Sequence, residues 1–247
     1  MNDFLSIAQK TVLEVRKILS EKSSDQLSLI NSNNKDIKLS ADFIAHNHII
    51  TALEKTKIPV FSEENNNLDK FELEDYQWIV DPLDGSFNYF RGFEMSAISI
   101  SLWKDGAPVI GVIAPIFSED IYFSSRGNGA WKNKNQIFVS ETNNIDEAIL
   151  ATGFPSGRNY DKVSLLKTVD NISKYKKIRM IGSAVMMLSM VASGVFDVYE
   201  EEDIYIWDVA AGLALINEAG GSFSLIESSS SVKFNVKASN QLLFDYN

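Results

Sequence analysis

The chain has 247 residues, of which 45% are hydrophobic and 23% are charged, and its formal net charge is −10. A chain of this length can bury a large core, and so acidic a surface disfavours binding to nucleic acid or to anionic membranes. The absence of cysteine excludes disulfides, thiolate nucleophiles and cysteine-ligated zinc.

The N-terminal residues lack the basic and apolar regions of a signal peptide. No segment approaches the ~20 apolar residues of a membrane-spanning helix. We therefore expect a cytoplasmic protein that binds neither membranes nor nucleic acid.

The first part of the chain predicts two helices and a short strand. Apolar residues recur at helical spacing over residues 4–19, and a second helix is expected over residues 40–56. Residues 21–36 are polar and indicate a loop with part of a hairpin. A strand is expected at residues 59–61, and residues 65–74 are typical of an exposed excursion.

The middle of the chain predicts antiparallel sheet. Residues 78–80 form an apolar run typical of a buried strand. Apolar and polar residues alternate over residues 98–103, as in a strand with unlike faces. Further strands are expected at residues 108–115, 119–124 and 130–131, joined by short turns.

The last part predicts two strands, at residues 148–152 and 177–181, separated by a helix near residues 162–174. Two apolar helices are expected at residues 184–192 and 207–219, each followed by glycine.

The chain shows no linker, so we predict two halves that pack tightly as one unit. Residues 1–140 form an α+β half with a mostly antiparallel sheet. Residues 141–247 form an α/β half with a second, smaller sheet.

The turn at residues 81–88, Asp-Pro-Leu-Asp-Gly-Ser-Phe-Asn, concentrates groups that bind cations and phosphate. Asp81 and Asp84 can converge on hard cations such as Mg²⁺, which prefer oxygen ligands. Gly85 permits a sharp reversal with an exposed N–H, and Ser86 adds a hydroxyl. Asp-Pro and Asp-Gly are also ordinary turn formers, so the motif alone leaves a plain turn open.

Other acidic positions have similar alternatives. Glu63 and Glu64 follow a strand, and because adjacent strand residues point to opposite faces, one can ligate while the other supports. They also suit a solvated pair. Asp42 and Asp208 lie early in helices, where a carboxylate simply complements the helix dipole.

The order of these motifs resembles the inositol monophosphatase family, within the magnesium-dependent, lithium-sensitive sugar and nucleotide phosphatases. The resemblance covers nearly the whole chain. The matching motifs are Ser62-Glu63-Glu64, Trp78 to Asn88, Gly182-Ser183-Ala184 and Trp207 to Gly212.

The resemblance implies a layered α-β-α-β-α fold and a homodimer. It implies that the first half carries most metal ligands, and that the second carries substrate contacts and the last ligand. One Mg²⁺ would be held by Glu63, Asp81 and the Leu83 carbonyl, and a second by Asp81, Asp84 and Asp208. A third, weaker ion would bind Glu63 and waters.

The same resemblance implies hydrolysis of a phosphomonoester without a covalent intermediate. Ser86 would hydrogen-bond the nucleophilic water. Asp42 and Glu63 would orient this relay of water and hydroxyl and accept its proton. The remaining implied positions contact the substrate: Asp84, Gly85, Ser86, Gly182, Ser183, Ala184, Glu201 and Asp208.

The chain departs from the family pattern at several positions. Ser86 stands where threonine is usual, which keeps the hydroxyl. Asp36 matches a loop aspartate, whereas the usual lysine position reads Asn31 and Lys35 is a candidate replacement. Glu201 is the glutamate before Trp-Asp by count, although Glu200 and Glu202 flank it.

His46 and His48 diverge by about 200° around a helix, which argues against a shared metal site and against functional roles for them. A serine or cysteine triad has little support.

The prediction is therefore an inositol-1-monophosphatase acting on a small phosphorylated polyol. Alternatives on the same fold are a fructose-1,6-bisphosphatase, a 3′(2′),5′-bisphosphate nucleotidase or a histidinol-phosphatase. An interaction protein that retains the fold is a third reading.

Overall fold

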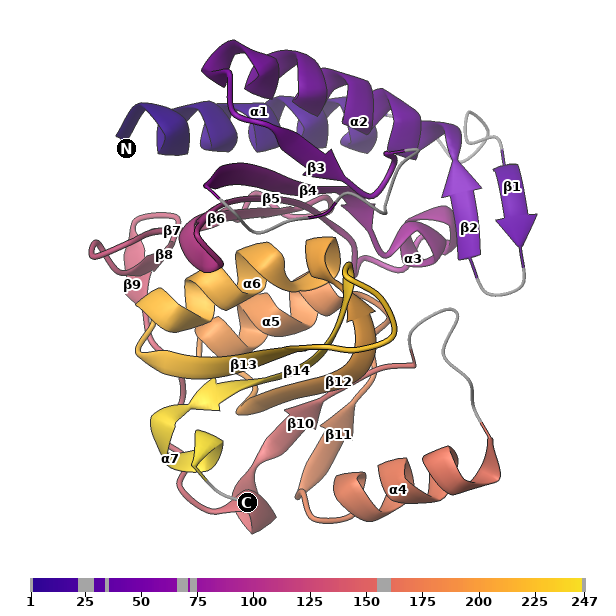
Figure 1. Ribbon diagram of the computed structural model, residues 1–247, viewed down its shortest axis with the longest axis vertical. Helices are drawn as coiled ribbons and strands as arrows, with labels where there is room; N and C mark the ends of the chain where they lie inside the picture. The colour runs from indigo at the N-terminus through magenta and orange to yellow at the C-terminus, as the bar shows by residue number, and fades with distance from the viewer. Residues whose placement is uncertain are drawn as a thin grey trace.

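The computed structural model describes residues 2–21, 29–33, 36–65, 71, 75–154 and 161–245. Helices and sheets alternate in the α-β-α-β-α order expected from the sequence (Figure 1). The outer helices of one side are α1 (Asn2–Ser20) and α2 (Ser40–Leu53), and a seven-stranded sheet follows them. The central helices are α5 (Ala184–Ala192) and α6 (Ile206–Glu218), and below them lie a five-stranded sheet and then α4 (Lys162–Ile172) and α7 (Gln241–Phe244).

The seven-stranded sheet is antiparallel except for its first pair, which is parallel. The predicted mostly antiparallel sheet is thus confirmed. Its strands, in spatial order, are β3 (Val60–Ser62), β4 (Tyr76–Asp84), β5 (Ala97–Lys104), β6 (Ala107–Pro115), β7 (Tyr122–Ser125), β8 (Ala130–Lys132) and β9 (Asn135–Ile137).

The five-stranded sheet mixes parallel and antiparallel pairs, with β10 parallel to both of its neighbours. A separate hairpin pairs β1 (Leu29–Asn33) with β2 (Asp36–Leu39). The strands of the smaller sheet, in spatial order, are β11 (Lys177–Arg179), β10 (Ile149–Ala151), β12 (Val198–Tyr205), β14 (Lys233–Asn240) and β13 (Gly221–Glu227).

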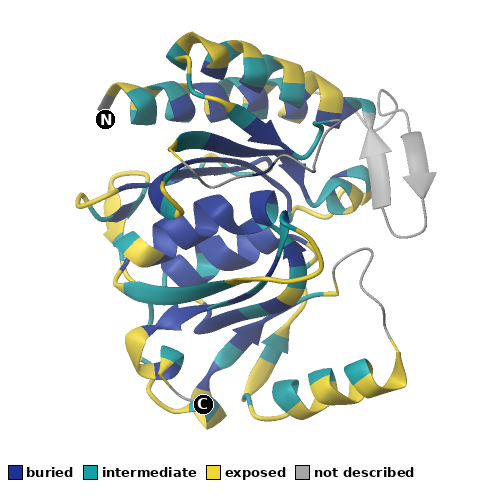
Figure 2. Cartoon of the chain, in the orientation of Figure 1, coloured by how far each residue is buried: buried dark blue, intermediate teal, exposed yellow. Residues whose placement is uncertain are grey.

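The core lies on both sides of the larger sheet, and the central helices are almost wholly buried (Figure 2). The alternation over residues 98–103 predicted unlike faces for β5, but both faces are buried. The reason is that α1 covers one face and α6 the other. On the α6 side, the polar Ser101 and Trp103 satisfy each other, since Trp103 Nε1 donates to Ser101 Oγ at 2.9 Å.

Part of the predicted excursion at residues 65–74 is also buried. Phe71 is 6% exposed and its ring lies 4.6 Å from that of Phe61. Apolar packing against the sheet therefore overrides the polar character of its neighbours in sequence.

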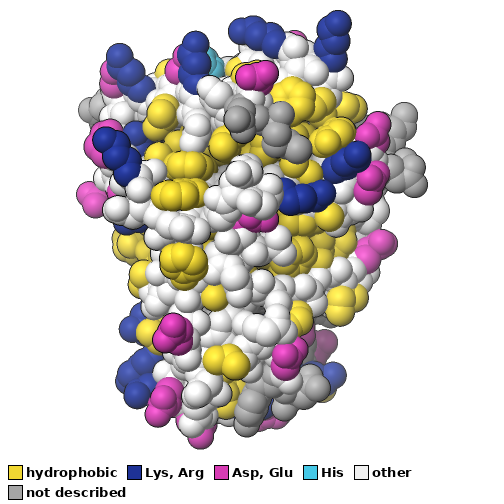
Figure 3. Space-filling view, turned by 90° about the vertical axis from the view of Figure 1, so that its left-hand side faces the viewer, with side chains coloured by type: hydrophobic (Ala, Val, Ile, Leu, Met, Phe, Trp, Pro, Cys, Tyr) yellow, Lys and Arg dark blue, Asp and Glu magenta, His cyan; other side chains and the backbone are white. Residues whose placement is uncertain are grey.

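The surface shows no single charged face in the view of Figure 3, where hydrophobic side chains gather across the middle and charged ones surround them. Within the described ranges, no helix combines the length and apolar character needed to cross a membrane.

Gly111 on β6 allows close contact between the larger sheet and α6. A Cβ at this position would lie 2.5 Å from Ala211 O and 2.8 Å from the Ala214 Cβ. Because backbone cannot move aside cheaply, we expect Gly111→Ala to lower the free energy of unfolding by about 1–3 kcal/mol. Urea denaturation measures this, and an unchanged midpoint would show that the helix can shift away from the sheet.

Candidate active site

The segment predicted as a turn at residues 81–88 is partly strand, because β4 continues through Asp84 with a register shift against β5 between Asp81 and Asp84. Asp81, 1% exposed, accepts a hydrogen bond of 2.9 Å from the Leu83 N–H, which fixes the tight turn around Pro82. Gly85 then reverses the chain with φ 75°, and α3 (Ser86–Arg91) begins. A Cβ on Gly85 would lie 2.8 Å from Met95 O, so a side chain here would clash with the Met95 backbone. The positive φ of Gly85 would also strain any residue with a side chain.

Three carboxylates from two distant parts of the chain meet beside this turn. Asp81 and Asp84 come from the end of β4, and Asp208 from the first turn of α6. One oxygen of each lies within 4.8 Å of the others. The family resemblance implied that all three share one metal site, and the structure brings them close together.

The electrostatics of this cluster are those of repelling acids removed from water. Burial, and then the charges of Glu63, Asp84 and Asp208, hold the pKa of Asp81 well above its usual range. Burial also raises the pKa of Asp84 to about 6, although hydrogen bonds to its carboxylate oppose the shift. For Asp208, burial and the charges of Asp84 and Glu63 again raise the pKa.

Glu63 lies at the edge of the same cluster, directly after β3. Its N–H donates to Val80 O at 3.2 Å, which aligns it with the end of β4. Its charge raises the pKa of both Asp81 and Asp208, so it adds to the negative charge of the cluster. Glu64 is partly exposed.

Ser86, the first residue of α3, contacts Asp42 of α2. The Ser86 hydroxyl lies 2.8 Å from Asp42 Oδ1 and 2.8 Å from Leu83 O, and it donates to them. Asp42 is 3% exposed on the first turn of α2. The pairing of these two residues was implied by the family resemblance alone, and the structure contains it.

The start of α5 supports Asp84. Ser183 is the N-cap residue: its Oγ accepts from Met186 N–H at 3.1 Å and donates to Asp84 Oδ2. The Val185 N–H donates to the same oxygen at 3.0 Å. Gly182 precedes them with φ 71° and is exposed, whereas Ala184 is buried. Ser183 therefore holds a carboxylate of the cluster.

Glu201 is the glutamate that faces the site. It is 6% exposed, accepts a hydrogen bond of 2.8 Å from Tyr199 OH, and its charge raises the pKa of Asp208. Glu200 instead accepts from Tyr175 OH at 3.4 Å, and Glu202 is exposed. Of the three glutamates, the one given by the count back from Trp207 is thus the one whose charge acts on Asp208.

Two contributors to the site had no predicted role. Asn88 Nδ2 donates to Met95 O and Ile181 O, each at 2.7 Å, and so links α3 to the segment before α5. Tyr199 supports Glu201, and its own pKa is raised by burial and by the Glu201 charge. Asn88 stands within the quoted motif, but an asparagine in a turn gives no sign of a long-range contact. Lys35, and the side chains of Asn31 and Asp36, lie outside the described residues.

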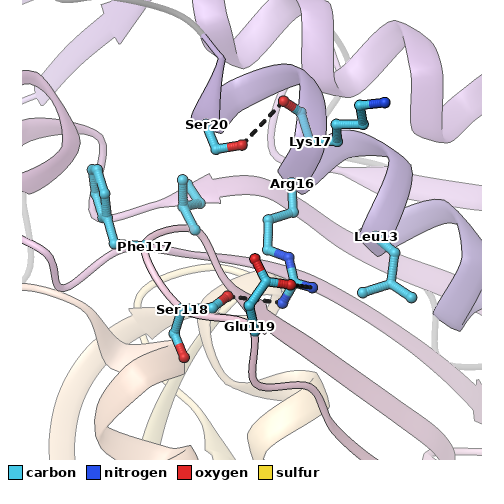
Figure 4. Close-up of a pocket in the computed structure, with 8 residues that line it drawn as sticks. Leu13, Arg16, Lys17, Ser20, Phe117, Ser118 and Glu119 are labelled. Carbon is cyan, nitrogen blue, oxygen red and sulfur yellow. Dashed lines mark hydrogen bonds and ion pairs between the residues drawn. The ribbon is translucent and has the colours of Figure 1, made fainter.

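A cavity of about 530 Å³ lies elsewhere, between α1 and the segment after β6 (Figure 4). Arg16 occupies its centre and donates to Ser118 O at 2.9 Å and Asp120 O at 2.7 Å, with Glu119 beside it. The Arg16 guanidinium thus stabilises the loop after β6. None of the predicted site residues lines this cavity.

The cluster fits a divalent cation. Its donors are oxygens only, as hard cations such as Mg²⁺ require. Buried carboxylates that raise one another's pKa are stabilised when a cation neutralises them. An acidic triad that can bind metal is therefore present in the structure.

Comparison with known proteins points to one family. The model of the inositol monophosphatase family matches residues 1–243. A protein of Aquifex aeolicus named fructose-1,6-bisphosphatase/inositol-1-monophosphatase is 33% identical over 174 residues, which cover 70% of this chain and 65% of that protein. An inositol-1-monophosphatase of Mesorhizobium japonicum is 31% identical over 226 residues, covering 91% and 84%.

Solved structures share the whole fold. The inositol monophosphatase of Anabaena is 27% identical, with a TM-score of 0.80 over 99% of this chain and 93% of that one. The extragenic suppressor protein suhB of Bartonella henselae is 29% identical, with a TM-score of 0.82 over 98% and 94%.

Proposed function

The chain belongs to the inositol monophosphatase family, and on that premise we propose that it hydrolyses inositol monophosphate or a similar small polyol phosphate with Mg²⁺. Membership makes the chain a phosphatase of a metal-dependent family. The observation that carries the finer proposal is the meeting of Asp81, Asp84 and the partly buried Asp208 beside Ser86.

We assign two to three Mg²⁺ ions to this cluster. Glu63, Asp81 and the Leu83 carbonyl would hold one ion, and Asp81, Asp84 and Asp208 a second, with Glu63 shared by a weaker third. Bound there, such ions activate water and stabilise the departing oxygen. They also offset the repulsion between an acidic protein and an anionic substrate.

The protein's own groups would position the reactants. The Ser86 hydroxyl donates to Asp42 and Leu83 O, so its oxygen lone pairs remain to accept a hydrogen bond from the attacking water. Glu63 and Asp42 would be the carboxylates that take up the proton. The Gly85 and Ser86 N–H groups at the start of α3 would bind phosphate oxygens.

The substrate's hydroxyls would meet the other side of the site. Glu201 presents a buried carboxylate next to Asp208, and Gly182 exposes backbone at the start of α5. Ser183 and Ala184 shape this wall, with the Ser183 hydroxyl engaged by Asp84.

Phosphate release from a substrate panel tests the proposal. The panel contains inositol monophosphate, fructose 1,6-bisphosphate, 3′-phosphoadenosine 5′-phosphate and histidinol phosphate, each with Mg²⁺ and with a chelator. We expect Mg²⁺-dependent turnover with the inositol ester preferred. Preference for the nucleotide would replace the substrate assignment, and no turnover of any ester would contradict the function.

A second candidate substrate is fructose 1,6-bisphosphate. The name of the Aquifex relative carries both activities, and this chain is 33% identical to it over the aligned residues. The homodimer, the cytoplasmic location and a separate role as an interaction protein stay predictions. Light scattering of the purified protein tests the first of these.

Ser86→Ala removes the hydroxyl that would orient the water. We expect a fall in kcat of about 100-fold, because Ser86 positions the water for proton transfer to a carboxylate, and such acid–base catalysis contributes roughly 10²–10⁴. Ser86→Thr keeps the hydroxyl and should retain most of the activity. Equal rates for Ser86→Ala and the wild type would remove Ser86 from the relay.

A further inference from the structure

His46 links α2 to the end of β3, immediately before Glu63. His46 Nδ1 and Ser62 Oγ are joined by a hydrogen bond of 2.9 Å. Ser62 is fully buried, whereas the His46 ring is partly exposed. A buried serine hydroxyl needs a partner, because a polar group left unpaired away from water costs about 1–3 kcal/mol.

The backbone around Ser62 is already fixed on its other side. Ser62 pairs in register with Val80 of β4, and the next N–H, that of Glu63, donates to Val80 O at 3.2 Å. Ser62 O accepts from Asn65 N–H at 3.0 Å, which closes the turn that carries Glu63. The His46 bond adds a side-chain link between this turn and the helix above it.

His46 follows Asp42 by one helical turn, so both side chains lie on the same face of α2. Asp42 holds Ser86, on the turn that carries Asp81 and Asp84. His46 holds Ser62, on the turn that carries Glu63. One face of one helix therefore contacts both of the turns that carry Glu63, Asp81 and Asp84.

We propose that His46 is a positioning residue: through Ser62 it sets the place of Glu63 relative to Asp81, and so tunes the affinity of the site for a divalent cation. The inference rests on the proposed metal site and deepens it. The sequence argued against a functional role for His46, because its spacing from His48 excludes a metal site shared by the two histidines. That spacing says nothing about a contact between His46 and a serine on another element.

His48 provides a matched control on the same helix. Its Nε2 lies 2.9 Å from Glu14 Oε2 on α1, on the side away from the cluster. His48→Ala thus removes a histidine and an interhelical hydrogen bond without touching Ser62.

The test measures Mn²⁺ binding by electron paramagnetic resonance, with melting temperature recorded for each variant. We expect His46→Ala and Ser62→Ala each to bind Mn²⁺ about 10-fold more weakly, because groups that orient a ligand are typically worth 10–100-fold in affinity. The double variant should be no weaker than either single one. His48→Ala should bind as the wild type does.

Conservative variants separate positioning from bulk. His46→Asn can place a polar atom near the position of Nδ1 and should recover most of the affinity. His46→Gln places it further out and should not. If His46→Ala fails to fold, Ser62→Ala provides the test of the inference, because it removes the same hydrogen bond by deleting only the Ser62 Oγ.

Two results would overturn the inference: wild-type Mn²⁺ affinity in Ser62→Ala, or an equal loss in His48→Ala. Asp84→Asn in the same assay keeps this separate from the proposed function. If the wild type itself binds no Mn²⁺, or Asp84→Asn binds as well as it does, the metal site fails and not merely the role of His46.

Discussion

Asp84→Asn is expected to lower kcat by at least about 1000-fold while leaving the fold intact. The substitution removes one of three clustered charges, and with it a cation stabilisation worth several kcal/mol, at about 1.4 kcal/mol per tenfold in rate. The asparagine carbonyl can still accept from Ser183 and the Val185 N–H, which now bond Asp84 Oδ2. Removing a charge that burial disfavours also avoids destabilising the fold.

Steady-state phosphate release over a range of Mg²⁺ concentrations measures the effect. Asp170→Asn, on the exposed side of α4, is the control for loss of one negative charge and should be unaffected. A near-normal rate for Asp84→Asn at any Mg²⁺ concentration would contradict the metal assignment.

The second large effect is a pH-dependent stabilisation by Mg²⁺. The folded-state pKa of Asp84 is raised from 3.8 to about 6, and those of Asp81 and Asp208 are also raised well above their usual range. Between about pH 4 and pH 6 the folded protein therefore holds protons that the unfolded chain has released. Without Mg²⁺, the free energy of unfolding should fall as pH rises through this window, and continue to fall as the other two acids ionise.

Mg²⁺ binds the deprotonated carboxylates and should reverse this loss. At 100 times its dissociation constant it adds about 2.7 kcal/mol, roughly 5–10 °C for a domain of this size. The shift in melting temperature should be larger at pH 7.5 than at pH 5, where protons compete with the cation. Sodium chloride of matched ionic strength is the control, and an equal Mg²⁺ shift at both pH values would contradict the account.

Much of the site could be predicted because its parts lie in local motifs. The segment from Asp81 to Ser86 contains the groups that its geometry requires: Gly85 for the reversal, and carboxylates at Asp81 and Asp84. The first turn of α6, which carries Asp208, and the N-cap of α5, Ser183, are likewise encoded by a few consecutive residues. The convergence of these motifs was implied by their order and by the resemblance to a known family, since distant side chains give no local sign of contact.

What the sequence did not reveal depends on neighbours in space. The alternating polar residues of β5 are buried because α6 supplies partners for Ser101 and Trp103. Phe71 is buried by Phe61, although polar residues surround it in sequence. Asn88 and His46 each bond atoms on another element, and an isolated turn asparagine or helix histidine has the same pattern whether or not it does so.

The most direct measurement of the central claim is anomalous diffraction from crystals grown with Mn²⁺. The account predicts anomalous peaks bounded by the carboxylates of Glu63, Asp81, Asp84 and Asp208, close to Ser86. Well-ordered carboxylates in the arrangement described, without a peak between them at saturating Mn²⁺, would show that the cluster is not a metal centre.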